Sequence, residues 1–163
     1  MSARSFLSKG YVMSDSNQTG EHANASEALP ISQRPASTAP GHWVLARVGK
    51  KVLRPGGLEL TLQMLSEAKL TGSRVVEYAP GLGRTASEIL AARPASYTGV
   101  DKDPAAAKHV RELVGIRGTV INADAADTGL ESGSADVVVG EAMLTMQGEK
   151  SKKAIISEAV RLL

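Results

Sequence analysis

The chain of 163 residues is long enough for one domain of ordinary size, and its composition, with 3% aromatic residues, is typical of a soluble globular protein. Its formal net charge of +2 gives no strong nucleic-acid signal. The absence of cysteine excludes disulfides, cysteine-ligated zinc and a cysteine nucleophile. The sequence shows no apolar run that could cross a bilayer and no apolar core of a secretory signal, so we expect a cytoplasmic protein.

The first 40 residues are rich in Ser, Ala, Asn, Gln and Pro. Such a segment cannot bury enough apolar surface to offset its ordering entropy, so we expect residues 1–40 to be a disordered tail and residues 41–163 to form the domain. The domain begins with a predicted amphipathic helix over 42–54, which has an apolar face and a basic face. We favour a lid that covers the sheet, and the alternative is a helix that lies on a membrane surface or an acidic partner.

Beyond Pro55-Gly56-Gly57, strands alternate with helices along the sequence. This alternation predicts an α/β fold with a parallel sheet and right-handed crossovers. We expect a Rossmann-like, doubly wound sheet whose first four strands have the order 3-2-1-4, preceded by an N-terminal helical extension. The expected elements are a helix over 58–70, a strand over 74–78, a helix over 84–93, a strand over 97–101, a helix over 104–114, strands over 118–122 and 135–140, and a helix over 151–163.

The apolar periodicity also predicts which helix faces are buried. In the helix over 58–70 the expected face is Leu58, Leu62, Leu65 and Ala68. In the helix over 151–163 the residues expected to point inward are Ile155, Ile156, Ala159, Val160 and Leu163.

The strand over 135–140 would be a long apolar edge of the sheet, which folded proteins usually protect. The sequence ends at Leu163 without a cap, a glycine or a proline. We therefore expect the sequence to be a piece of a longer protein, so that the domain over 41–163 is incomplete at its C-terminus.

The most informative segment of the sequence is Arg74 to Thr85, in which a short apolar strand ends in Glu77 and a tight loop with Gly81 and Gly83 leads into a helix. The acid can accept hydrogen bonds from a ligand, and the glycines let the backbone approach it because they carry no Cβ. Such a loop at the carboxyl end of the first strand is where an open α/β sheet holds a nucleotide-like ligand.

Further candidate ligand groups follow the next strands. Asp101 ends the second strand, where a carboxylate can accept both hydroxyls of a ribose. After the third strand, Asp124 can accept from an adenine amino group and the backbone N–H of Ala125 can donate to the ring. Glu141 and Ala142 follow the fourth strand, across the switch point from the glycine loop, where the reactive end of a cofactor should emerge.

The chain thus carries four ordered segments: Glu77-x-Ala79-x-Gly81-x-Gly83, Gly99-Val100-Asp101, Asn122-Ala123-Asp124-Ala125 and Ala135-Asp136-Val137-Val138-Val139. In this order and at these spacings they resemble the first four motifs of class I S-adenosylmethionine-dependent methyltransferases. The resemblance covers residues 74–163. It departs at Ala79, where family members usually carry glycine, and an alanine is tolerated there unless the residue needs a positive φ.

The resemblance implies S-adenosyl-L-methionine as the cofactor and a role for each matching residue. Glu77 and the backbone from Ala79 through Gly81 to Gly83 would hold the methionine part, and Tyr78 beside them would either pack or touch the ligand. Asp101, with Lys102 next to it, would bind the ribose, Asp124 and Ala125 the adenine, and Glu141 and Ala142 would line the sulfonium side. The resemblance names no catalytic base and no metal ligand, and it leaves the methyl acceptor open, with a small molecule favoured over a macromolecule.

Two other classes of function stay open at this point. The spacing Gly81-x-Gly83-x-x-Ala86 also matches the fingerprint of NAD(P)- or FAD-dependent oxidoreductases, in which the helix N-terminus holds a pyrophosphate. The charge of Glu77 within the strand and the adenine contact of Asp124 argue against that site, whereas Arg84 and Thr85 could serve either anion. A non-catalytic nucleotide-binding module is the third hypothesis.

Overall fold

The structure is a computed structural model that describes residues 56–163. The expected tail over 1–40 and the expected helix over 42–54, with its lid or membrane role, lie outside the described residues. Within residues 56–163, no helix is both long and apolar enough to span a membrane.

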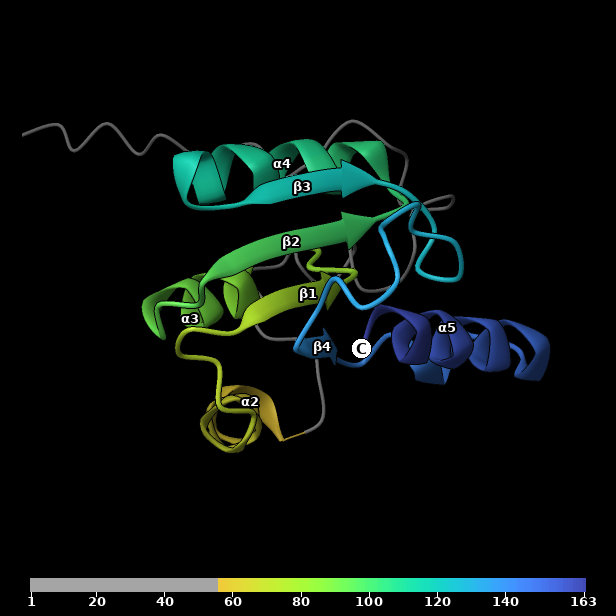
Figure 1. The fold of residues 1–163 in the computed structure, drawn as a ribbon, viewed down its shortest axis with the longest axis horizontal. Coiled ribbons are helices and arrows are strands. Elements are labelled where there is room, and N and C mark those ends of the chain that lie inside the picture. Colours follow the sequence, from red (N-terminus) through yellow and green to blue (C-terminus); the bar gives the residue numbers. More distant parts are fainter. Residues whose placement is uncertain (1–55) are drawn as a thin grey trace, which may run out of the picture.

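Strands and helices alternate along the described chain as the sequence pattern predicts (Figure 1). Asp103 caps the helix after the second strand, because its side chain accepts hydrogen bonds from the backbone N–H groups of Ala105 and Ala106 and Pro104 occupies the first turn. The elements are α2 (Gly57–Glu67), β1 (Arg74–Tyr78), α3 (Arg84–Ala91), β2 (Ser96–Asp101), α4 (Pro104–Val114), a 3-10 turn η1 (Gly115–Arg117), β3 (Thr119–Asn122), β4 (Val137–Gly140), a 3-10 turn η2 (Leu144–Met146) and α5 (Glu149–Leu162).

The described strands form one parallel sheet in the order β3-β2-β1-β4, which confirms the predicted fold class and strand order. In the register, Glu77 of β1 pairs with Gly99 of β2 on one side and with Val139 of β4 on the other. Because all strands run the same way, their carboxyl ends lie at the same edge of the sheet.

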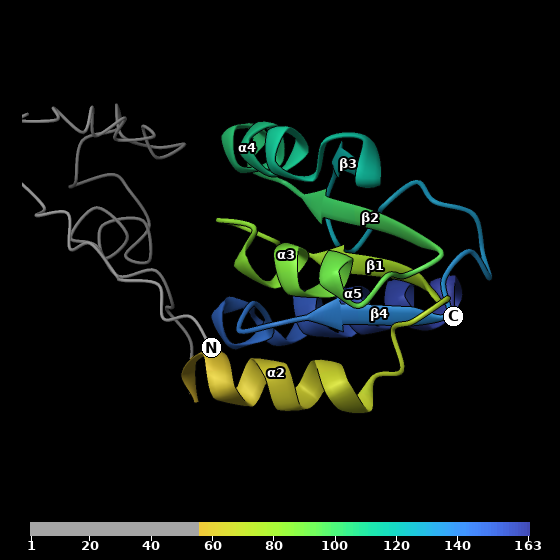
Figure 2. The ribbon, with the colours of Figure 1, turned by 90° about the vertical axis from the view of Figure 1, so that its left-hand side faces the viewer.

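Helices cover both faces of the sheet. Figure 2 shows α2, α3 and α4 on one face and α5 on the other. Two apolar clusters fill the two interfaces: Val75, Ile89 and Val110 belong to the first, and Val76 and Ile155 to the second. Successive residues of β1 thus point to opposite clusters, as the pleat of a strand requires.

The strand β4 is shorter than the predicted strand over 135–140. It begins at Val137, and the backbone N–H of Ala135 donates to the carbonyl of Leu162 in α5, at 2.9 Å. The carboxylate of Asp136, the residue before β4, accepts hydrogen bonds from the backbone N–H and the guanidinium of Arg74, each at 2.7 Å. These hydrogen bonds lower the pKa of Asp136 to about 2.

The predicted buried faces of α2 and α5 are correct in part: Leu65 and Ile155 are buried, and Ala68 and Ala159 pack against the two apolar clusters. In α2 the buried residues are Thr61 and Leu65, whereas Leu62 is 44% exposed. In α5 the buried residues are Ile155, Glu158 and Leu162. Each stripe contains a polar residue that apolar periodicity alone passes over. Contrary to the prediction, Ile156, Val160 and Leu163 are exposed.

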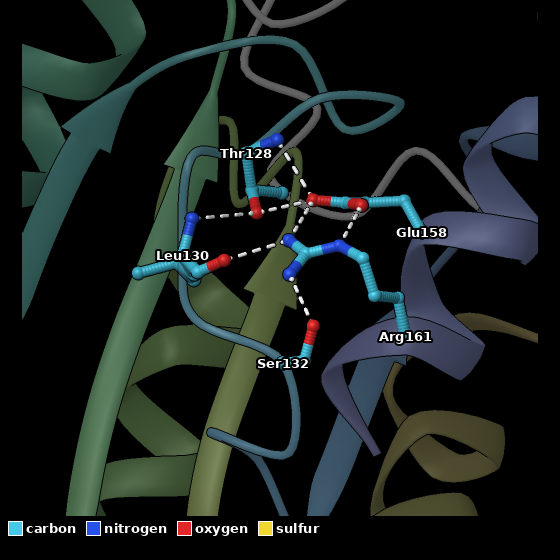
Figure 3. A network of polar contacts seen from close by, with 5 residues as sticks. All are labelled: Thr128, Leu130, Ser132, Glu158 and Arg161. Atoms are coloured by element: carbon cyan, nitrogen blue, oxygen red, sulfur yellow. Dashed lines mark hydrogen bonds and ion pairs between the residues drawn. The ribbon is translucent and has the colours of Figure 1, made fainter.

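Glu158 can lie on the buried face of α5 because hydrogen-bond donors surround its carboxylate (Figure 3). Its Oε1 accepts hydrogen bonds from the backbone N–H of Thr128 at 2.9 Å and from the hydroxyl of Thr128 at 2.6 Å. Arg161 donates to both carboxylate oxygens, at 2.7 and 2.8 Å, and also to the carbonyl of Leu130 and the hydroxyl of Ser132. This network ties α5 to the loop between β3 and β4.

The donors around Glu158, first the Arg161 guanidinium and then Thr128, lower the pKa of this carboxyl from 4.5 to about 2, although burial opposes the shift. A group whose pKa is lower in the folded state adds stability above its unfolded pKa. Its contribution is therefore complete above about pH 5 and is lost as the pH falls toward 2.

The loop after β1 contains positive-φ residues, as a turn that leads back over the sheet edge requires. Gly81 and Gly83 have φ values of 58° and 73°, which glycine adopts at little cost. Ala79 has φ 52°, so the residue that stands in place of the family's usual glycine does take the conformation that disfavours a Cβ. Its backbone N–H donates to the carbonyl of Val100 at 2.8 Å, which fixes the loop against β2.

We predict that Glu158→Gln lowers the free energy of unfolding at pH 7 by about 1.5–3 kcal/mol, the usual loss for hydrogen bonds to a charged group. The difference from the parent should shrink between about pH 5 and pH 2, because the parent loses this contribution there. Urea unfolding across that pH range measures it. Glu112→Gln, in an exposed pair with Lys108, is the control and should change stability by less than about 0.5 kcal/mol. An equal effect of Glu158→Gln at every pH would contradict the assignment.

We predict that Ala79→Gly leaves stability unchanged or raises it by up to about 1 kcal/mol, because relief of the positive-φ cost offsets the greater freedom of glycine in the unfolded chain. The matched control is Ala154→Gly in α5, where an exposed alanine has ordinary helical geometry. That control should cost about 1 kcal/mol. Thermal unfolding of both variants gives the comparison, and equal destabilisation by both substitutions would refute the role of φ at Ala79.

Candidate functional site

The loops that leave the four strand ends lie at the carboxyl edge of the sheet (Figure 1). Each strand end contributes one acid that the sequence analysis singled out: Glu77 in β1, Asp101 at the end of β2, Asp124 after β3 and Glu141 after β4. The fold therefore brings the predicted ligand groups to one edge, in the spatial order of the sheet.

The glycine loop and the start of α3 are packed closely against the fold. The backbone N–H of Gly83 donates to the carbonyl of Pro80 at 2.8 Å, which closes the turn. A Cβ added at Gly83 would lie 3.1 Å from a methyl group of Leu113, so glycine lets the start of α3 lie against α4. Gly81 would meet only the carbonyl oxygen of Ala79, at 3.8 Å, so its glycine is needed for the backbone angle and not for space.

Asp101 connects the second strand to the glycine loop. Its Oδ2 accepts a hydrogen bond from the backbone N–H of Gly81 at 3.2 Å, and its Oδ1 accepts one from the N–H of Asp103 at 2.9 Å. The side chain of Asn122 donates to the carbonyl of Asp101 at 2.8 Å. Asp101 is 7% exposed, so its side chain is largely buried at the carboxyl edge of the sheet. A carboxylate oxygen accepts two hydrogen bonds, and these contacts are compatible with a role in holding a pair of hydroxyls.

Glu77 is only 3% exposed, and its Oε2 accepts a hydrogen bond from the hydroxyl of Tyr97 at 2.7 Å. Tyr97 comes from β2 and belongs to the apolar cluster beneath α3 and α4. Burial and, next, the neighbouring Glu77 carboxylate raise the pKa of Tyr97, so its hydroxyl keeps its proton and remains a donor.

Glu141 joins β4 to two helices. Its Oε1 accepts a hydrogen bond from the hydroxyl of Thr61 in α2 at 2.5 Å, and its Oε2 accepts one from the hydroxyl of Thr85 in α3 at 3.0 Å. Thr85 lies in the first turn of α3, so a carboxylate lies beside the N-terminus of the helix that follows the glycine loop. Ala142 comes next, exposed and with φ 55°.

The turn after β3 is built around Asp124. Its Oδ1 accepts a hydrogen bond from the backbone N–H of Ala126 at 2.9 Å, and its carbonyl accepts one from the N–H of Asp127 at 3.0 Å. Asp124 is exposed, whereas Ala125 is buried in the cluster beneath α5. The network of Glu158 begins at Thr128, so α5 fixes the far end of this turn.

The other predicted site residues lie farther from these contacts. Tyr78 points away from Glu77 and is buried in the cluster beneath α5, so the structure places it as a packing residue. Its hydroxyl is buried and has no hydrogen-bond partner among the described residues. Lys102 is exposed beside Asp101.

The edge carries four acids, and the two side chains at the start of α3 that could bind an anion already have partners. The guanidinium of Arg84 pairs with Glu88 of the same helix at 2.8 Å, and the hydroxyl of Thr85 is used by Glu141. Both side chains therefore have partners within the chain. In the part of the chain that the structure describes, no group of His, Cys, Asp and Glu residues is arranged to hold a metal ion.

Thr61 and Tyr97 also contact acids of this edge, and neither was predicted from the sequence. Thr61 gives no signal, because a threonine within an apolar helix has no motif that marks it. Tyr97 could have been found, because it shares a strand face with Gly99 and Asp101 by the period of two. A tyrosine two positions before a glycine lies on the same strand face, and the missing side chain of the glycine leaves room for the ring to extend along the strand.

Comparisons with known proteins agree with this geometry. A family model described as a methyltransferase domain matches residues 75–163. A Haemophilus influenzae protein described as uncharacterized is 34% identical over 129 residues, which are 76% of this chain and 51% of the relative, so the chain spans about half the length of that relative.

Two solved structures show the same fold. A candidate S-adenosyl-L-methionine-dependent methyltransferase from Methanococcus maripaludis has a TM-score of 0.57 and 13% identity, over 64% of this chain and 49% of that one. A candidate RNA methyltransferase from Pyrococcus horikoshii has a TM-score of 0.57 and 19% identity, over 83% of this chain and 67% of that one. With the family match over more than half of its length, the chain belongs to the class I methyltransferase-domain family.

Proposed function

We propose that this chain binds S-adenosyl-L-methionine at the carboxyl edge of its sheet and forms the cofactor-binding part of a methyltransferase that acts on a small-molecule acceptor. The observation that carries the proposal is the placement of one carboxylate at each of four adjacent strand ends, around a positive-φ glycine loop, in a chain of the methyltransferase-domain family. The small net charge supports a small acceptor over a nucleic acid.

The residues at this edge fit the chemistry of that cofactor. S-adenosyl-L-methionine carries an ammonium, a sulfonium, two ribose hydroxyls and an adenine amino group, all of which a carboxylate can attract or accept from. It also carries one carboxylate, a smaller anion than a pyrophosphate, to which backbone N–H groups of the loop would donate. Glu77 with the loop Ala79–Gly83 would hold the methionine part, and Asp101 beside Lys102 the ribose. Asp124 and Ala125 would hold the adenine, and Glu141 with Ala142 would line the sulfonium side.

The cofactor supplies an activated methyl group, so the work of the chain is to hold and orient it toward a nucleophile. The rigid parts of the edge suit this task. The loop is fixed to β2 through Ala79 and through Asp101, and Glu141 is fixed by two threonine hydroxyls from separate helices. Because hydroxyl groups from two helices hold both oxygens of Glu141, we assign it to positioning.

The dinucleotide hypothesis is weaker for an electrostatic reason. A dinucleotide places a pyrophosphate at the N-terminus of the helix after the glycine loop. Here the Glu141 carboxylate lies beside that N-terminus, hydrogen-bonded to Thr85, and would repel the pyrophosphate. Arg84, which could offset that repulsion, is paired with Glu88.

We predict that calorimetric titration of the purified chain gives saturable binding of S-adenosylhomocysteine and no binding of NADH, because the acidic edge favours a ligand without a pyrophosphate. Binding of NADH in preference to S-adenosylhomocysteine would overturn the proposed function. Binding of S-adenosylhomocysteine without methyl transfer to any acceptor in a broad small-molecule screen would instead favour a non-catalytic module.

We predict that Asp101→Ala weakens S-adenosylhomocysteine binding by about 1–3 kcal/mol, through loss of hydrogen bonds to a charged group. Asp127→Ala is the matched control, because Asp127 is an exposed acid in the turn after β3 and has no assigned ligand contact. Titration calorimetry of both variants, with thermal unfolding to confirm that each is folded, provides the measurement. An unchanged affinity in Asp101→Ala would remove this residue from the site.

A further inference from the structure

Tyr97 places a hydroxyl deep in the wall behind the glycine loop. The residue is 2% exposed and lies near the start of β2, where it pairs with Val75, two residues before Glu77 in β1. Its side chain extends along the strand and passes Gly99, which is the register partner of Glu77. The hydroxyl reaches the Glu77 carboxylate at 2.7 Å, so one aromatic side chain links β2 to the acid of β1.

Two glycines make room for this ring. A Cβ added at Gly99 would lie 3.0 Å from the Tyr97 hydroxyl oxygen and 3.4 Å from a ring carbon of Pro80 in the glycine loop. A Cβ added at Gly118 would lie 2.7 Å from the aromatic ring of Tyr97, closer than atoms of this kind approach. Gly118 has extended backbone, so its glycine serves space and not a special angle. The ring is therefore seated in a space that these two positions leave open.

The hydrogen bond between the Tyr97 hydroxyl and Glu77 has a defined direction. An ionised Glu77 can only accept hydrogen bonds, and Tyr97 keeps its proton because burial and the nearby carboxylate both oppose its ionisation. The phenol is therefore the donor and the carboxylate the acceptor. A charge-assisted hydrogen bond of this kind holds the acceptor in one rotamer more firmly than a neutral pair would.

We propose that Tyr97 is a positioning residue that acts through Glu77 to set the affinity of the site for the amino-acid end of the cofactor, and does not affect the affinity for the adenosine end. The inference rests on the proposed function, because it takes Glu77 as the acid of the methionine part. The adenosine end falls to Asp101 and Asp124 on the neighbouring strand ends, which have their own backbone donors. Removal of the phenol hydroxyl should therefore affect one part of the ligand and not the other.

The chain offers a control that is matched in size, burial and chemistry. Tyr78 is 3% exposed, also adjoins Glu77, and points to the opposite face of the sheet. Its hydroxyl has no hydrogen-bond partner among the described residues. Tyr97→Phe and Tyr78→Phe thus remove the same atom from two buried tyrosines, of which only Tyr97 donates to Glu77.

The experiment measures two ligands on the purified chain and both variants by titration calorimetry. S-adenosylhomocysteine carries the amino-acid end, and 5′-methylthioadenosine lacks it. In Tyr97→Phe we expect the affinity for S-adenosylhomocysteine to fall about tenfold and that for 5′-methylthioadenosine to change less than about twofold. In Tyr78→Phe we expect neither affinity to change by more than about twofold.

Other outcomes would overturn the inference. An equal loss of affinity for both ligands in Tyr97→Phe would mean that the hydroxyl supports the fold in general, and an unchanged affinity for both would mean that it has no role in binding. A parent chain that bound neither ligand would overturn the proposed function itself, which separates that failure from a failure at Tyr97.

A double-mutant cycle tests the route through Glu77. If Tyr97 acts by holding Glu77, then Tyr97→Phe should have no further effect on S-adenosylhomocysteine affinity in a Glu77→Ala background, because the acceptor is already gone. A tenfold loss that persisted in that background would show that Tyr97 acts by another path, and would overturn the assignment.

Discussion

A carboxylate that leaves water must receive hydrogen-bond donors, and this requirement explains how the acids of this chain connect its elements. Glu77 accepts a hydrogen bond from the hydroxyl of Tyr97 in β2, and Asp101 accepts one from the backbone N–H of Gly81 in the glycine loop. Glu141 takes hydroxyls from α2 and α3. Glu158, on the other face, takes donors from the loop after β3. Each acid thus connects, by hydrogen bonds, segments that are distant in sequence. Removal of one acid would weaken the contact between two elements.

The sequence predicted those features that depend on local patterns. The alternation of strands and helices, the strand order, the Asp103 cap and the gathering of acids at strand ends follow from periodicity, turn residues and the geometry of parallel sheets. Apolar periodicity does not predict whether a charged or hydroxyl-bearing residue lies on the buried or the exposed face of a helix, because this depends on its hydrogen-bond partner. Glu158 and Thr61 are buried because they form hydrogen bonds there with Thr128, Arg161 and Glu141, and the predicted helix faces missed these two positions for that reason.

The glycine loop shows the same limit at the level of the backbone. The spacing of Gly81 and Gly83 indicated where the turn lies, and both adopt the positive φ that glycine allows. The alanine at position 79 was expected to be tolerated only at ordinary φ, yet it adopts 52°. Its N–H bonds to β2, and the loop it begins is held by Asp101, so contacts on both sides keep a conformation that alanine disfavours. A strained backbone at the head of a ligand loop is consistent with a fixed site rather than one that forms on binding.

The placement of charge decides between ligands that the backbone alone accepts equally well. A positive-φ glycine loop before a helix suits any small anionic group, so the fold is shared by sites for different cofactors. Glu141 changes this balance, since a carboxylate beside the first turn of α3 opposes a second anion there and favours a cation nearby. Thr61 is what keeps it there, through a hydrogen bond from a helix that precedes the first strand. Under the proposed function, the choice of cofactor would therefore depend in part on α2, which lies outside the residues that the family model matches.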